Sequence, residues 1–133
     1  LLASSAASDV YKRQDIELQS VEMDGSLTQT PEFPYNWMYD GSRPQMPGFE
    51  MEITCKSLFL IFKDSGEMDV GKADVFVNDV YCMTADPHKN NWLHCNAVLL
   101  FWETESRSHK VRIAVTEEDR NKKFTILGFG YTI

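Results

Sequence analysis

The chain has few positive charges and no long apolar run. Its 133 residues include 13 basic and 20 acidic side chains, a formal net charge of −7, and no basic cluster. Nucleic acid and anionic membranes are therefore not expected partners, because phosphate groups and anionic lipids repel an acidic surface. No apolar stretch approaches the roughly 20 residues that cross a bilayer as a helix.

Cysteine, glycine and proline are also scarce. There are three cysteines, none in a CxxC pair, together with 7 glycines and 5 prolines. An odd, sparse set of cysteines argues against a disulfide scaffold and is typical of reduced thiols in the cytoplasm; one disulfide with one remaining thiol is the alternative. With 43% hydrophobic residues, a chain of this length buries a single core and forms one domain.

Motifs for nucleophilic catalysis are missing. No G-x-S-x-G elbow and no Gly-Asp-Ser block occurs. Cys82 and Cys95 lie near Asp86, His88 and His94 in the sequence, and a Cys–His pair can act as nucleophile and base. Both cysteines fall in apolar runs, however, where cysteine usually packs as a small hydrophobe. We therefore expect no catalytic residue.

Metal ligands are not grouped either. Asp86, His88 and His94 are spaced more loosely than the paired ligands of zinc sites. The loop 64–69 (DSGEMD) offers oxygen ligands for calcium, but its spacing matches no EF-hand. We expect no metal and no cofactor.

The chain does contain a series of strand-type segments. Residues 49–55 alternate apolar and polar side chains, which indicates a half-buried strand. Residues 57–63 are almost continuously apolar, which is typical of a strand covered on both faces. We expect further strands at 73–77, 80–84, 95–102, 110–115 and 124–133, with charged solvated turns at 103–108 and 117–123. Short strands without an amphipathic helix predict an all-β fold, either a sandwich or a barrel.

Two details refine this prediction. The dipeptide 78–79 (Asn-Asp) between two apolar runs predicts a hairpin turn. In the closing segment, glycines at every second position permit close approach of a neighbouring strand or mark a bulge. The two faces of that segment are Leu127, Phe129 and Tyr131 on one side and Gly128 and Gly130 on the other.

The N-terminal residues do not fit the rest of the chain. Residues 1–14 include SSAASDVYKRQ, which resembles translated sequencing-adapter text found at the ends of metagenomic reading frames. We expect a non-native leader and a missing natural N-terminus; a short polar leader or linker is the alternative. Residues 15–32 are expected to form a linker or edge segment, and residues 33–133 the sandwich.

Aromatic side chains beside amides form the candidate binding site. Trp37, Tyr39 and Trp92 lie in predicted loops with Asn90 and Asn91. A flat aromatic ring can stack on a pyranose while amides bond its hydroxyls, so these five residues are a candidate carbohydrate site. The competing interpretation is that the two tryptophans plug the ends of the core.

A third tryptophan, Trp102, ends an apolar run. We expect it to pack in the core or at a sheet edge.

Four landmarks in order carry a family resemblance. They are a hairpin GKADVFVN at 71–78, an N-x-W loop at 90–92, an S-x-x-H-x-V-x-I strand at 106–113 and a closing FTILGFGY at 124–131. Residues 33–133 thereby resemble the C-terminal β-sandwich of bacterial SGNH/GDSL-type hydrolases. They are also similar to the galactose-binding-like jelly roll that precedes the catalytic domain of acetyl-xylan-type carbohydrate esterases.

The resemblance implies a single antiparallel β-sandwich of jelly-roll, galactose-binding-like type that serves as a non-catalytic accessory domain. Such a domain packs on an SGNH-type catalytic domain of the same polypeptide, and a plant or bacterial glycan is a further candidate ligand. A structural module without a ligand is the alternative. The family's catalytic residues belong to the absent domain, so none is carried over. Where the family shows Asp-Gly, this chain has Asn78-Asp79, so a looser turn is expected.

Overall fold

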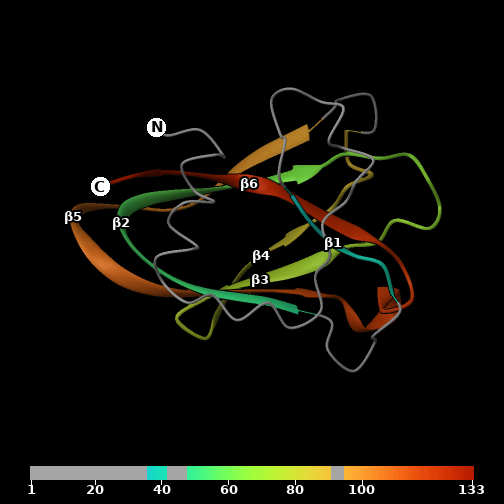
Figure 1. Ribbon diagram of the computed structural model, residues 1–133, viewed down its shortest axis with the longest axis horizontal. Coiled ribbons are helices and arrows are strands. Elements are labelled where there is room, and N and C mark those ends of the chain that lie inside the picture. Colours follow the sequence, from blue (N-terminus) through green and yellow to red (C-terminus); the bar gives the residue numbers. More distant parts are fainter. Residues whose placement is uncertain (1–35, 42–47, 91–94) are drawn as a thin grey trace.

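The computed structural model describes residues 36–41, 48–90 and 95–133, and these form one antiparallel sheet of six strands. The strand order is β1-β6-β2-β5-β3-β4 (Figure 1), which confirms the all-β prediction. The predicted boundaries at residues 14 and 32 lie outside the described residues. No helix in the described ranges is long and apolar enough to cross a membrane. The elements are β1 Trp37–Tyr39, β2 Gly48–Lys63, β3 Ala73–Val77, β4 Val80–Ala85, β5 Cys95–Val115, the 3-10 turn η2 Glu117–Asp119 and β6 Phe124–Thr132.

Two long strands turn this single sheet into a sandwich. The second half of β2 pairs with β6, whereas its first half pairs with the part of β5 that also pairs with β3. The register shifts at the junction: Cys55 pairs with Arg107 but Ser57 pairs with Trp102, so β5 carries extra residues between these two pairs. Extra residues on one strand bend a ladder. Both strands accordingly turn over at one end of the molecule and join its two layers (Figure 1).

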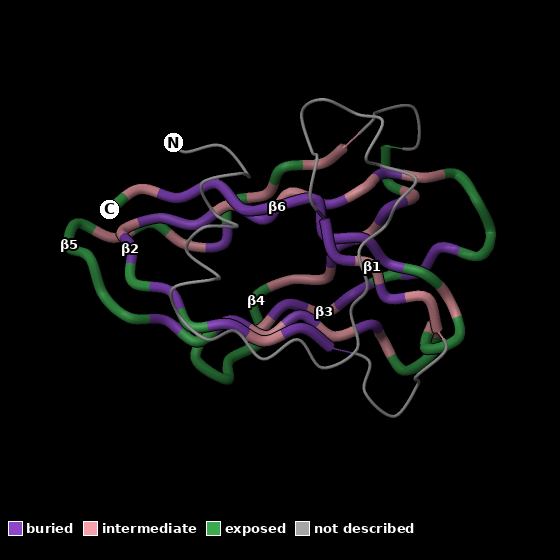
Figure 2. The backbone as a smooth tube through the Cα atoms, in the orientation of Figure 1, coloured by how far each residue is buried: buried purple, intermediate pink, exposed green. Residues whose placement is uncertain are grey.

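The predicted turn at 103–108 is wrong. β5 continues through these residues, and the segments predicted separately at 49–55 and 57–63 are likewise one strand. The charged residues lie where the sandwich folds over, so their side chains reach solvent while the backbone remains extended (Figure 2). The abundance of charge correctly indicated exposure, but exposure does not require a turn.

The core fills the space between the layers. Phe49 of β2 stacks on Phe129 of β6, with ring centroids 5.7 Å apart. The predicted alternation at 49–55 is confirmed, because its apolar members are buried and its polar members are not. For 57–63 the prediction holds for one face only: Leu58, Leu60 and Phe62 are buried, whereas Phe59 and Ile61 are half-buried on the outer face.

The β3–β4 hairpin is tight, contrary to the expected loose turn. Asn78 and Asp79 have φ angles of 52° and 64°, the left-handed values of a two-residue type I′ turn. Asn78 also joins the turn to β5: its N–H donates to the Lys110 carbonyl at 2.8 Å, and its Oδ1 accepts the Lys110 N–H at 3.0 Å. One backbone and one side-chain hydrogen bond to β5 thus hold the turn although glycine is missing.

A carboxylate in η2 ties two loops together. Asp119 Oδ2 accepts the Lys72 N–H at 2.9 Å, and Oδ1 lies 3.1 Å from Lys122 Nζ. A Cβ at Gly71 would lie 2.5 Å from the Asp119 Cβ, so this close approach needs glycine. Burial acts to raise the pKa of Asp119, but the hydrogen bond from Lys72 and the charge of Lys122 outweigh it and lower the pKa.

We expect Asp119→Asn to lower the free energy of unfolding by about 1–2 kcal/mol at pH 7. A lowered pKa means that the carboxylate stabilises the fold above its unfolded-state pKa of about 4 and loses this effect as pH falls through the folded-state value. Urea denaturation at pH 7 and near pH 3 measures the loss of stability and its dependence on pH. The difference between variant and wild type should shrink in acid; an equal difference at both pH values would contradict the assignment.

Candidate functional site

The candidate carbohydrate residues of β1 lie in the core. Trp37 is 7% exposed and Tyr39 is 3% exposed. They were expected in a loop but form a short strand that pairs with β6. The Trp37 ring is tilted against Phe49 at 5.8 Å, and the Tyr39 hydroxyl donates to the Arg120 carbonyl. Burial raises the pKa of Tyr39. Neither side chain offers a free ring face to a sugar.

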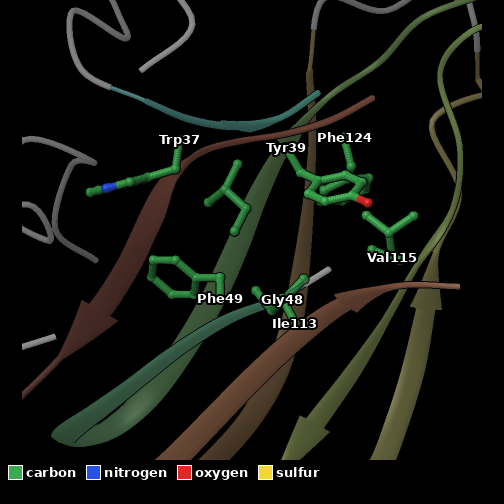
Figure 3. Close-up of a pocket in the computed structure, with 9 residues that line it drawn as sticks. Trp37, Tyr39, Gly48, Phe49, Ile113, Val115 and Phe124 are labelled. Atoms are coloured by element: carbon green, nitrogen blue, oxygen red, sulfur yellow. The ribbon is translucent and has the colours of Figure 1, made fainter. Parts of the chain in front are cut away.

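A small apolar pocket opens beside these two rings. It is lined by Trp37, Tyr39, Phe49, Phe124 and neighbouring aliphatic side chains from both layers (Figure 3). Its free volume is about 10 Å³. That is about the space of one water molecule, so a pyranose ring does not fit. The geometry agrees with the interpretation in which Trp37 plugs one end of the sandwich.

The other members of the candidate set lie in the loop before β5. Asn90 is exposed at the end of a turn. Asn91 and Trp92 lie outside the described residues. Sugar binding by Asn90, Asn91 and Trp92 therefore stays a prediction.

The cysteines differ in exposure: Cys55 is buried, Cys95 is half-buried and Cys82 is exposed, so the expectation that Cys82 packs as a small hydrophobe is wrong. Cys55 is fully buried, and burial, followed by the charge of Glu103, raises its pKa to about 11. Cys82 donates its S–H to a β5 carbonyl at 3.6 Å, and burial raises its pKa. The His88 Nε2 lies 2.7 Å from the Val70 carbonyl oxygen, a hydrogen bond that engages the ring nitrogen. These environments favour thiols over the thiolates that nucleophilic catalysis requires.

Two carboxylates of the loop 64–69 are also engaged. Asp64 accepts a hydrogen bond from Asn96 Nδ2 at 3.0 Å, and Asp69 lies 3.0 Å from Lys123 Nζ. Among the residues that the structure describes, no group of three or more His, Cys, Asp or Glu side chains could hold a metal ion.

Trp102 also differs from its predicted position. It is 72% exposed rather than packed in the core or at an edge. The cause is a bulge: Leu58 and Phe59 of β2 pair with Phe101 and Leu99, so Leu100 is an extra residue on β5. Strict alternation would place Leu100 and Trp102 on the same inner face. The extra residue turns Trp102 outward, and no sequence signal marks it.

Solved structures share this fold. The structure of a family two carbohydrate esterase from Cellvibrio japonicus matches with a TM-score of 0.60 and 16% identity, over 95% of this chain and 32% of the esterase. A two-domain esterase active on acetylated mannans, co-crystallized with mannopentaose, matches with a TM-score of 0.63 and 14% identity, over 90% of this chain and 34% of the esterase.

An acetyl xylan esterase from the rumen bacterium Butyrivibrio proteoclasticus matches with a TM-score of 0.57 and 14% identity, over 94% of this chain and 30% of the esterase. The chain therefore spans about a third of the length of these esterases. At such low identity the likeness establishes the fold alone. No protein-family model and no curated protein matches the sequence.

Proposed function

We propose that this sandwich is a non-catalytic accessory domain of an SGNH-type carbohydrate esterase, where it packs on the catalytic domain and binds glycan. The main support is that the structural matches cover unequal shares of the two chains: nearly all of this chain superimposes on about a third of each esterase. A domain that corresponds to one third of a two-domain enzyme has its natural partner in the remaining two thirds.

The alternative is a structural module that binds no ligand. The burial of Trp37 and Tyr39 and the water-sized pocket beside them favour it, because the rings expected to stack on sugar stabilise the core instead. The two functions differ in one measurable property, which is affinity of the isolated chain for polysaccharide.

Two assays test the proposal. Ester hydrolysis is measured with acetylated xylan, acetylated mannan and a chromogenic acetate ester, and we expect no turnover above background. Retardation in native gels that contain soluble xylan, glucomannan or hydroxyethylcellulose measures glycan binding. Retardation by at least one polysaccharide supports the glycan role. Mobility unchanged in every gel favours the structural module, and ester hydrolysis would overturn the accessory assignment.

A further inference from the structure

The indole of Trp102 is the largest apolar side chain that reaches solvent in the described part of the chain. A single exposed apolar residue is common on a folded domain, whereas a contiguous apolar patch marks a binding surface, so the neighbours of the indole decide its significance. Trp102 lies in β5 opposite Ser57 of β2, and Ser57 pairs in turn with Thr132 of β6. Residues paired across a sheet project from the same face. The indole therefore stands on the outer face of the layer, away from the core.

The outer face is uncharged on one side of the indole, whereas Glu103, Glu105 and Arg107 follow on its other side. In the next rows along the same face, Leu99 pairs with Phe59 and Ala97 pairs with Ile61. Leu99 is 52% exposed, and its partner Phe59 is half-buried. A quarter of all residues in this chain are charged, and acidic side chains predominate. An uncharged platform on such a surface accepts a neutral ligand in preference to an ionic one.

The size of the platform distinguishes a sugar from a protein partner. A tryptophan that is 72% exposed presents roughly 180 Å² of its surface. Leu99 adds a smaller area, while Phe59 and Ile61 are already half covered. A stable protein interface buries about 800 Å² on each partner, several times this area. One protruding ring with a short apolar flank is the scale of one or two sugar units.

A hydroxyl pair lies in the same row as the indole. Ser57 Oγ and Thr132 Oγ1 are 2.7 Å apart. Ser57 is 4% exposed, whereas Thr132 is half-buried. When the Ser57 hydroxyl donates to Thr132, the Thr132 O–H is left to donate to a ligand. The row thus offers an aromatic ring that can stack on the C–H groups of a sugar and a hydroxyl that can donate to a sugar oxygen.

We propose that Trp102 is the stacking platform for a pyranose unit of a neutral polysaccharide, with Thr132 as a hydrogen-bond donor beside it. This inference rests on the proposed glycan role and moves it from the candidate loop residues to the outer face of β5. The class of ligand follows from what can stack on the indole ring of Trp102. Stacking requires a pyranose face of axial C–H groups without axial hydroxyls, as in β-1,4-linked glucose and xylose chains.

The test is titration calorimetry of the whole chain with cellohexaose, xylohexaose and mannohexaose. We expect the cello- or xylo-oligosaccharide to bind most tightly, Trp102→Ala to weaken binding at least tenfold, and Trp102→Phe to retain part of the affinity. Because the indole is exposed, Trp102→Ala should leave the unfolding midpoint unchanged. The matched control is Tyr81→Ala, which removes a 57% exposed aromatic ring from β4 and should leave binding intact.

The outcomes separate this inference from the proposed function. If the wild type binds and Trp102→Ala binds equally well, the platform is wrong while the glycan role stands. If the wild type binds none of the three sugars and no polysaccharide in the gels, both are wrong. If the chain self-associates and Trp102→Ala abolishes that without an effect on sugar, the face is a protein contact and the platform is overturned.

Discussion

Replacing Phe49 with alanine is expected to lower the free energy of unfolding by about 3–5 kcal/mol. Phe49 is 1% exposed and lies between the two layers, against Phe129 of β6 and Trp37 of β1. Its removal leaves a cavity bounded by three strands whose backbones are fixed by the ladder, so the site can collapse only partly. Urea denaturation followed by tryptophan fluorescence measures the loss.

Phe59→Ala is the matched control, because it deletes the same side chain from the same strand on the opposite face. Phe59 is half-buried and faces outward, so less apolar surface is lost and no enclosed cavity forms. We expect a loss of about 1 kcal/mol. If the two variants were equally destabilised, the outer face would be as densely packed as the core, and the sandwich geometry derived from the cross-strand register would be wrong.

Much of this fold could be predicted because short-range patterns determine it. The alternation at 49–55 and the dipeptide at 78–79 depend only on neighbouring residues and on the period of a strand, and both are confirmed. The joining of segments into long strands could not be predicted. Residues 103–108 carry the composition of a solvated turn, yet they lie in a strand because β2 and β5 fold over together.

The candidate site was harder to predict than the fold, for a related reason. Whether an aromatic ring faces the core depends on strand register, and one extra residue in a bulge reverses the face. Leu100 is such a residue, and it places Trp102 outside. Trp37 had the opposite outcome, since polar neighbours in the sequence indicated a loop while pairing with β6 placed the ring against Phe49.

The hairpin turn should be the second most sensitive position. We expect Asn78→Ala to lower the free energy of unfolding by about 3 kcal/mol. Alanine at a φ of 52° costs about 1–2 kcal/mol. The lost side chain also leaves two partners unpaired, the Lys110 N–H and the Nδ1 of His109, which lies 3.0 Å from Asn78 Nδ2. His109 is 5% exposed, so its ring nitrogen has little access to water.

Asn78→Gly separates these two contributions. Glycine adopts the left-handed backbone at no steric cost and keeps the N–H bond to the Lys110 carbonyl, but it lacks the side-chain bonds to Lys110 and His109. The free energy of unfolding should therefore fall by less, about 1–2 kcal/mol. Asp79→Gly introduces glycine at the other left-handed position, and Asp79 makes only an exposed 3.7 Å contact with Lys110 Nζ. The free energy of unfolding of Asp79→Gly should lie within about 1 kcal/mol of the wild-type value. Urea denaturation of all three variants gives the order of their stabilities. If Asn78→Gly were as stable as the wild type, the side-chain bonds of Asn78 to Lys110 and His109 would make no net contribution to stability, which would contradict their assigned role.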